Sequence, residues 1–245
     1  MDPRRRFTAT VDRYDRYRPD YPEALVDALS DLAVGAAVVE LGAGTGILSR
    51  QLAARGLSVT AVEPNEAMRT AGAAHADSSG VRWVAGSAEQ TGLAAASADL
   101  VVGAQAFHWF DLDRALPEID RLLVPGAWAV AAWNDRVEHG FAAAYDEVLL
   151  AWSDTYADVP RPGPTLEALE ARRPEGRRLR FPHRQVLDLD GVIGRAWSSS
   201  YVVHGVSDRQ GFDDALQAAF RAHALDGRVD LAYETVAWAW PRREP

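Results

Sequence analysis

Residues 38–46 read VVELGAGTG, in which two apolar residues and an acid precede three alternate glycines. Residues 36–41 are rich in strand-forming side chains, and residues 45–55 carry the apolar spacing of a helix. A glycine-rich turn between a strand and a helix leaves the first backbone N–H groups of the helix free and lets a ligand lie against the backbone. We therefore predict a nucleotide-type binding site at this turn.

Strands and helices alternate on both sides of the turn. Apolar, β-rich runs predict strands at 36–41, 57–62, 81–85, 98–103 and 127–133. Helical spacing and Pro or Gly punctuation predict helices at 22–33, 45–55, 64–74 and 112–123. Pro117 predicts a kink in the last of these, or its division into two pieces. The alternation indicates an α/β fold, a doubly wound and mostly parallel sheet with helices on both faces.

The alternation stops after about residue 134. Helical patterns continue at 140–157 and 208–225, and residues 185–190 (QVLDLD) are a possible strand. Residues 231–240 alternate well enough for a final antiparallel strand, which we expect at one edge and which completes a seven-stranded sheet. Residues 158–183 are rich in Pro and Arg, and we predict a mobile loop or an insertion over the site there.

Composition narrows the class of protein. The 245 residues are 48% hydrophobic and 25% charged, which is the balance of a globular chain, and the net charge of −9 weighs against binding to nucleic acid. The absence of Cys rules out disulfides and thiolate metal sites. No run approaches the roughly 18 apolar residues of a membrane span. No cluster of His, Asp and Glu has metal-ligand spacing. Together these observations predict a cytoplasmic protein with no metal, no membrane and no nucleic-acid partner.

Two acids indicate which nucleotide the turn would bind. The dinucleotide fingerprint is G-x-G-x-x-G, but Ile47 occupies the position of its third glycine. Glu40, two residues before Gly42, would repel a pyrophosphate and suit a cationic ammonium or sulfonium ligand. Glu63 ends the next strand, where an acid can accept hydrogen bonds from both ribose hydroxyls. A dinucleotide oxidoreductase, and glycines needed only for tight packing, remain as alternatives.

Further segments extend the pattern along most of the chain. They are FTATVDRYDRYRPDYP (7–22), AVEPNEAMR (61–69), VAGSAEQTGL (84–93), ADLVVGAQAFHWFD (98–111), RLLVPGAWAVAAWN (121–134), SSSYVV (198–203) and AYETVAWAW (232–240). With VVELGAGTG, and in this order, they resemble the class I S-adenosylmethionine-dependent methyltransferases. The similarity is greatest to the small-molecule group (type 11) that includes the trans-aconitate methyltransferases.

The resemblance implies a set of cofactor-binding residues. They are Tyr14, Arg18, Glu40, Gly42, Gly44, Glu63, Pro64, Asn65, Ser87, Ala88 and Gln105. Arg18 suits the methionine carboxylate, because a guanidinium binds a carboxylate as a two-pronged fork. Many relatives have Asp at the position of Ser87, so we expect a weaker bond to the adenine amine here.

The resemblance also implies how one methyltransferase domain, 1–245, is organised. Residues 1–22 would cover the cofactor, 23–134 would form the cofactor-binding core, 135–206 a lid and substrate region, and 207–245 the last helix and edge strand. The reaction implied is transfer of a methyl group from S-adenosylmethionine, leaving S-adenosylhomocysteine. We expect a small-molecule acceptor and a monomer or homodimer.

The acceptor side carries the least information. His108 is a candidate general base or hydrogen-bond donor, because its ordinary pKa lies near neutrality, or a histidine that fixes its loop. Trp109, Tyr145 and Tyr201 are candidate substrate contacts, although aromatic residues at helical spacing are more often core. We expect O-methylation of a carboxylate or a hydroxyl. The alternative is a protein that binds S-adenosylmethionine and steers a reaction without methyl transfer.

Overall fold

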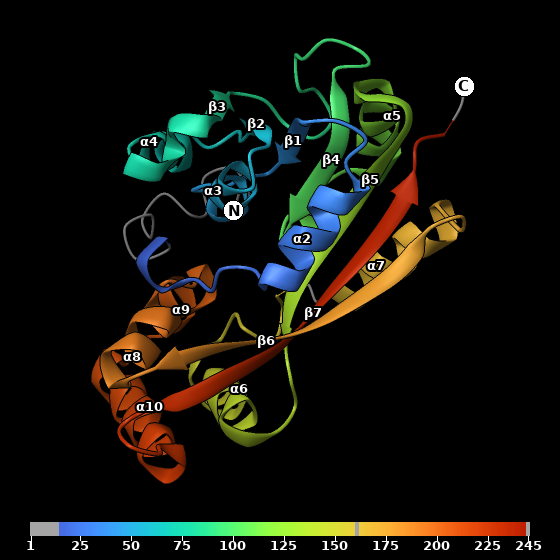
Figure 1. Cartoon of the computed structure of the whole chain (residues 1–245). Coiled ribbons are helices and arrows are strands. Elements are labelled where there is room, and N and C mark those ends of the chain that lie inside the picture. Colours follow the sequence, from blue (N-terminus) through green and yellow to red (C-terminus); the bar gives the residue numbers. More distant parts are fainter. Residues whose placement is uncertain (1–14, 160–161, 244–245) are drawn as a thin grey trace.

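The computed structural model describes residues 15–159 and 162–243. These residues form a seven-stranded sheet in the order β3-β2-β1-β4-β5-β7-β6 (Figure 1). The strands are β1 (Ala37–Leu41), β2 (Ser58–Val62), β3 (Val81–Val84), β4 (Ala98–Ala104), β5 (Leu123–Arg136), β6 (Arg177–Leu187) and β7 (Val229–Pro241). Strands β1 to β5 pair in parallel, and β7 pairs antiparallel with both β5 and β6. The predicted mostly parallel, doubly wound sheet is confirmed.

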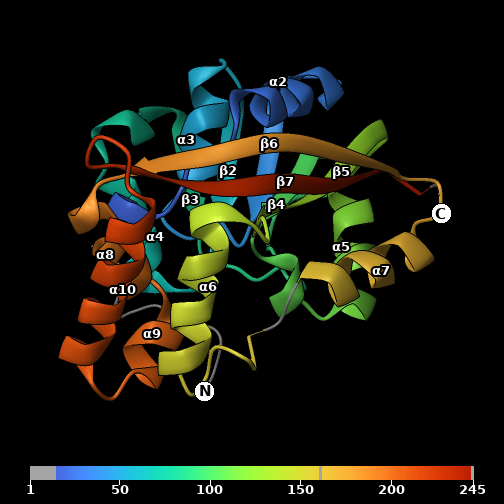
Figure 2. The ribbon, with the colours of Figure 1, turned by 90° about the horizontal axis from the view of Figure 1, so that it is seen from below.

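Helices cover both faces of the sheet, because its central strands carry apolar side chains on both faces. Figure 2 shows α2 and α3 on one side and α5 and α7 on the other. The helices are α2 (Glu23–Leu32), α3 (Ile47–Ala54), α4 (Glu66–Ala73), α5 (Leu112–Leu122), α6 (Gly140–Trp152), α7 (Pro162–Arg172), α8 (Leu189–Trp197), α9 (Ser200–Gly205) and α10 (Arg209–His223), with short 3₁₀ turns η3 (Ala76–Gly80) and η4 (Phe107–Trp109).

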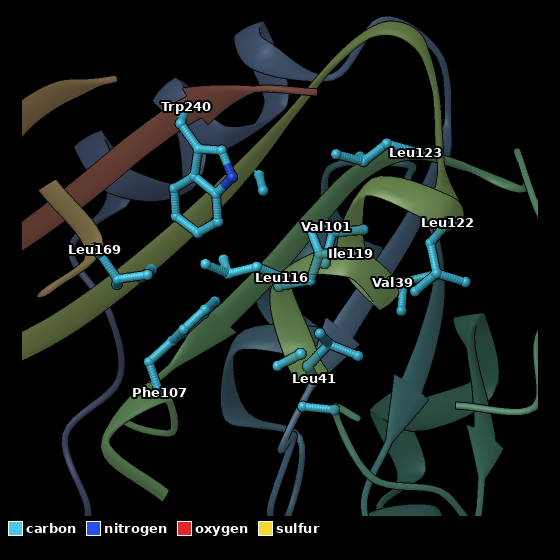
Figure 3. Close-up of a cluster of buried hydrophobic side chains, with 14 of the residues drawn as sticks. Val39, Leu41, Val101, Phe107, Leu116, Ile119, Leu122, Leu123, Leu169 and Trp240 are labelled. Carbon is cyan, nitrogen blue, oxygen red and sulfur yellow. The ribbon is translucent and has the colours of Figure 1, made fainter. Parts of the chain in front are cut away.

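The side chains of α5 form the centre of the core on one face. Leu116 and Ile119 pack against Val39 and Val101 of the sheet, and Trp240 of β7 closes the cluster (Figure 3). Phe107, in the turn after β4, lies with its ring centre 5.8 Å from that of Trp240, nearly edge to face. This packing fixes the start of the β4–α5 loop, which carries His108 and Trp109.

A helical subdomain, defined here as α6, α8, α9 and α10, follows the sheet. In Figure 1 its helices gather at the end of the molecule toward which β5 runs. It has its own apolar cluster, built around Phe212, Leu216 and Val192. Asp188 and Asp208 cap α8 and α10 by accepting from the backbone N–H groups of Gly191 and Gly211 at 2.8 and 3.0 Å. The subdomain is thus a packed unit built on the sheet.

The loop predicted at 158–183 is wrong. Residues of this stretch form α7 and the first part of β6, which extends to Leu187 and includes the start of the possible strand at 185–190. Leu166 and Leu169 face the core from α7 at helical spacing. The arginines and Pro182 of β6 lie on an edge strand, where charges and proline are common because they block pairing with another chain. These residues obscure, in the sequence of β6, the alternation of apolar and polar side chains that would indicate a strand.

Three smaller predictions are also corrected. Strand β7 lies between β5 and β6 and not at an edge, so the region 135–206 contributes the edge strand and cannot be a lid alone. Strand β5 extends well beyond the predicted 127–133 at both ends. Helix α5 is a single helix with Pro117 inside it, so its predicted division into two pieces is wrong.

Candidate functional site

A cavity of about 330 Å³ lies where β1, β2 and β4 end. In an open α/β sheet this is the edge at which ligands bind. Ten of the predicted site residues line it: Glu40, Gly42, Gly44, Glu63, Pro64, Asn65, Ser87, Ala88, Gln105 and Trp109. The ends of these neighbouring strands therefore bring together residues that lie far apart in the sequence.

The glycine turn has the left-handed backbone that its composition predicts. Gly42, Gly44 and Gly46 have φ angles of +68°, +59° and +78°. A Cβ on Gly42 would lie 2.8 Å from the Cβ of Ala106, and one on Gly46 would lie 2.7 Å from the ring of Trp83. Tight packing thus explains two of the glycines. Gly44 lines the cavity itself.

The carboxylate of Glu63 connects two loops. One oxygen accepts from the N–H of Gly44 at 2.9 Å and the other from the N–H of Asn65 at 2.8 Å. Burial raises the pKa of Glu63, although these two bonds and Arg69 oppose the rise. Each carboxylate oxygen has a second lone pair, so the side chain can hold the loops and still accept from a ligand in the cavity.

Glu40 is a second buried acid in the same wall. Its carboxylate accepts a short hydrogen bond from the hydroxyl of Ser49 in the first turns of α3. Burial raises its pKa to about 7, against the opposing effects of Ser49 and Arg50, while Glu63 adds to the rise. A cationic ligand would favour the ionised form, because an opposite charge stabilises a carboxylate. The cavity therefore has an acidic wall suited to a cation.

Gln105 holds a strained position between the cavity and β5. Its φ is +54°, a conformation that residues other than glycine rarely adopt and that is found at functional sites. Its backbone N–H donates to the carbonyl of Ala132 at 2.8 Å, and its side chain donates to the carbonyl of Asn134 at 3.0 Å. These two bonds to β5 hold the turn in place.

Sequence reasoning missed several cavity residues. They include Tyr21, Ile47, Met68 and Glu89. Glu89 accepts from the N–H of Asp111 at 3.0 Å, and although burial opposes it, hydrogen bonding that includes Ser87 lowers its pKa. Glu89 stands two residues after Ser87, so its carboxylate was visible in the sequence, but nothing there indicated that it lines the cavity.

Four of the described site residues that were predicted do not line this cavity. His108 is partly buried; its Nδ1 accepts from the indole N–H of Trp133 at 3.5 Å, which supports an anchored ring. Arg18 donates to the hydroxyl of Ser199 at 3.3 Å, at the α8–α9 junction. The other two, Tyr145 and Tyr201, are buried in the helical subdomain. The predicted Tyr14 lies outside the described residues.

Two features bear on the kind of protein. Within 15–159 and 162–243, no group of three or more His, Cys, Asp or Glu side chains could hold a metal ion. The same residues contain no helix with the length and apolar character of a membrane span.

The chain is similar to known proteins over much of its length. Residues 39–131 match the family model of a methyltransferase domain. An uncharacterized methyltransferase of Mycobacterium tuberculosis is 37% identical over 165 residues, covering 66% of this chain and 67% of that protein. An uncharacterized methyltransferase of Schizosaccharomyces pombe is 34% identical over 136 residues, covering 54% of this chain and 53% of that protein.

A solved structure extends the likeness beyond the matched domain. A protein from Anaeromyxobacter dehalogenans, assigned as a type II methyltransferase, has a TM-score of 0.69 and 26% sequence identity, covering 94% of this chain and 100% of that one. The chain belongs to the S-adenosylmethionine-dependent methyltransferases of class I. The trans-aconitate-like subgroup stays a prediction.

Proposed function

We propose that the cavity binds S-adenosylmethionine and that the protein transfers the methyl group to an oxygen of a small-molecule carboxylate or hydroxyl. The observation that carries this proposal is the pair of buried acids, Glu40 and Glu63, on either side of a left-handed glycine turn. A dinucleotide would place its pyrophosphate against Glu40, which charge repulsion disfavours.

The residues fit the cofactor part by part. Glu63 would accept from the ribose hydroxyls with the lone pairs that its backbone bonds leave available. Glu40 and the backbone of Gly42 and Gly44 would face the cationic methionine part, beside Gln105. Pro64, Asn65, Ser87 and Ala88 would border the adenine. Glu89 would supply the carboxylate acceptor for the adenine amine that Ser87 lacks.

Methyl transfer needs little from the protein beyond positioning and exclusion of water. The bound cofactor supplies a methyl carbon already activated by a sulfonium. An oxygen lone pair of the acceptor forms the new bond to this carbon, and the electron pair of the broken carbon–sulfur bond goes to sulfur. A carboxylate acceptor loses no proton, whereas a hydroxyl must lose one to a base. The helical subdomain would close over the acceptor. Of the segment 1–22 that was expected to cover the cofactor, residues 1–14 lie outside the described residues.

His108 is the available base on the β4–α5 loop, and its replacement separates two roles. If His108 contacts the acceptor, His108→Ala should lower turnover at least tenfold with unchanged affinity for S-adenosylhomocysteine, since general base catalysis contributes about 10²- to 10⁴-fold. Turnover and calorimetric affinity are the measurements. A lower melting temperature with normal turnover would assign His108 to holding the loop.

The reaction itself is tested by its products. We expect mass spectrometry to detect the gain of one methyl group on members of a panel of small carboxylates and phenols. Tight cofactor binding without any methylated product would favour the alternative, a protein that uses the cofactor without transferring its methyl group. We further propose a cytoplasmic monomer or homodimer, which gel filtration with light scattering would test for the oligomeric state.

A further inference from the structure

The helical subdomain contains an arginine–tyrosine cluster, defined here by its members. They are Arg136, Arg195, Tyr145, Tyr156, Tyr201 and Tyr233. Arg136 ends β5, Arg195 lies in α8, and the phenols come from α6, the turn after it, α9 and β7. Two guanidiniums in one interior are unusual, because a buried charge is costly unless it is paired.

Arg195 differs from Arg136 in having no carboxylate partner among the described residues. Arg136 donates to the carboxylate of Asp146 at 2.8 Å. Arg195 is only 3% exposed, and its hydrogen-bond partners are the hydroxyls of Ser199 at 3.0 Å and Tyr233 at 3.4 Å.

Two phenols have the properties of groups that await a ligand. Tyr145 is fully buried, and its hydroxyl has no hydrogen-bond partner among the described residues. Tyr201 is in the opposite situation: although burial opposes it, Arg136, Arg195 and Arg18 together lower its pKa to about 7.

No member of the cluster lines the cofactor cavity, but two links connect the cluster with it. Arg136 follows by two residues Asn134, whose carbonyl accepts from Gln105 in the cavity wall. Tyr21 lines both this cavity and a second hollow of about 620 Å³, and Tyr233, the partner of Arg195, lines the second hollow too. In Figure 1 the subdomain lies at the end of the sheet toward which β4 and β5 run, and the residues that line the cavity follow the ends of β1, β2 and β4.

We propose that Arg195, with Arg136 and the hydroxyl of Tyr145, binds a carboxylate of the methyl acceptor. The inference rests on the proposed function and narrows its substrate class to small carboxylic acids. A guanidinium matches a carboxylate with two parallel hydrogen bonds. A carboxylate would give Arg195 the anionic partner that it lacks among the described residues. The hydroxyl of Tyr145 would gain its missing partner in the same step.

The test uses the full chain saturated with S-adenosylhomocysteine, so that no transfer occurs. The probes are acetate, benzoate and fumarate, each compared with its amide, and phenyl phosphate as a dianion. We expect the carboxylates to raise the melting temperature more than the amides and more than phenyl phosphate. Equal effects of acid and amide would overturn the proposal, as would the strongest effect from phenyl phosphate.

Two variants assign the effect to the cluster. Arg195→Met should weaken the response to benzoate at least tenfold and leave the affinity for S-adenosylhomocysteine unchanged, because it removes the guanidinium that would bind the carboxylate. Arg221→Met makes the same change at an exposed position of α10 and should leave the benzoate response unchanged. If Arg195→Met fails to fold, Tyr145→Phe, which removes only the unpartnered hydroxyl, should weaken the benzoate response without loss of stability.

Each result has a separate meaning. A benzoate response that persists unchanged in Arg195→Met or Tyr145→Phe would overturn this inference alone, provided that S-adenosylhomocysteine binds. If the wild-type protein shows no heat with S-adenosylhomocysteine in a calorimetric titration, the proposed function itself fails.

Discussion

Glu40 and Glu63 line the same cavity, but their surroundings give them different properties. Both oxygens of Glu63 accept backbone N–H bonds, whereas Glu40 has the hydroxyl of Ser49 and is fully enclosed. Burial therefore has the larger effect on Glu40, whose pKa rises to about 7. A residue with this pKa makes both stability and ligand binding depend on pH near neutrality.

Glu40 should make the folded protein less stable as pH rises. Its pKa is 4.5 in the unfolded chain and about 7 in the folded one, so the unfolded state releases its proton first. The stabilising contribution is complete below 4.5 and is lost as pH rises through about 7. Relative to Glu40→Gln, the wild type should lose on the order of 3 kcal/mol of unfolding free energy between about pH 4 and pH 8.

Urea denaturation of both proteins at the two pH values measures this difference. Glu66→Gln, at an exposed position of α4, is the matched control and should follow the wild type. Parallel pH profiles for wild type and Glu40→Gln would contradict the assignment.

At the residue scale, sequence reasoning succeeded where a residue follows a strand. Glu40 and Glu63 could be placed because parallel strands end at one edge, which fixes their neighbours. Arg136 and Arg195 could not, since they lie on β5 and α8 and only tertiary packing brings them near one another. Nor did the sequence indicate the left-handed backbone of Gln105, which tertiary bonds to β5 impose.

At the scale of the elements, helix α4 packs closely against β3 where Gly72 faces the ring of Trp83. A Cβ on Gly72 would lie 2.2 Å from the ring of Trp83 and 2.9 Å from the carbonyl oxygen of Thr45. Neither the rigid ring nor the backbone can move away at little cost. Gly72 is therefore required by packing, although glycine is a poor helix former.

Gly72→Ala should destabilise the protein by about 1–3 kcal/mol, the usual range for overpacking, despite the better helix propensity of alanine. Gly163→Ala is the control and should be neutral or stabilising, because Gly163 lies in the first turn of α7 and an added Cβ would meet nothing within 4 Å. Thermal unfolding of both variants checks this. A Gly72→Ala protein as stable as the wild type would contradict the close contact.

The elements that the sequence predicted correctly are those with simple patterns. β1, β2 and β4 are short apolar runs between Gly or polar residues, and their register follows from burial on both faces. Helix α7 and strand β6 were missed because Pro and Arg indicated a loop. In the structure those residues occupy a helix start and the outer side of an edge strand, where they are tolerated.

On the scale of the whole molecule, β5 and β7 join the sheet to the helical subdomain. Both strands extend beyond the ends of β1 and β4, and their far ends carry Arg136 and Tyr233. Strand β5 thereby connects the two regions, because it carries Arg136 and also accepts the hydrogen bonds from Gln105 in the cavity wall. The sequence predicted the sheet and a separate helical region, but not that two long strands connect them.

Ligand binding should stabilise this assembly as a whole. At a free S-adenosylhomocysteine concentration about one hundred times its Kd, linkage adds about 2.7 kcal/mol to the folded state. For a chain of this size the melting temperature should rise by about 5–10 °C. Hydrogen exchange should slow in residues 42–46, 63–65 and 105–110 more than in α7. Equal protection throughout, or none, would place the ligand elsewhere.

Calorimetric titration of the full chain with S-adenosylhomocysteine most directly tests whether the cavity between Glu40 and Glu63 holds the cofactor. We predict one site per chain, no heat with NAD, and binding weakened by about 1–3 kcal/mol in Glu63→Ala, the scale for hydrogen bonds to a charged group. Glu66→Ala should bind as the wild type does. Absence of heat with S-adenosylhomocysteine, or full affinity in Glu63→Ala, would contradict the site.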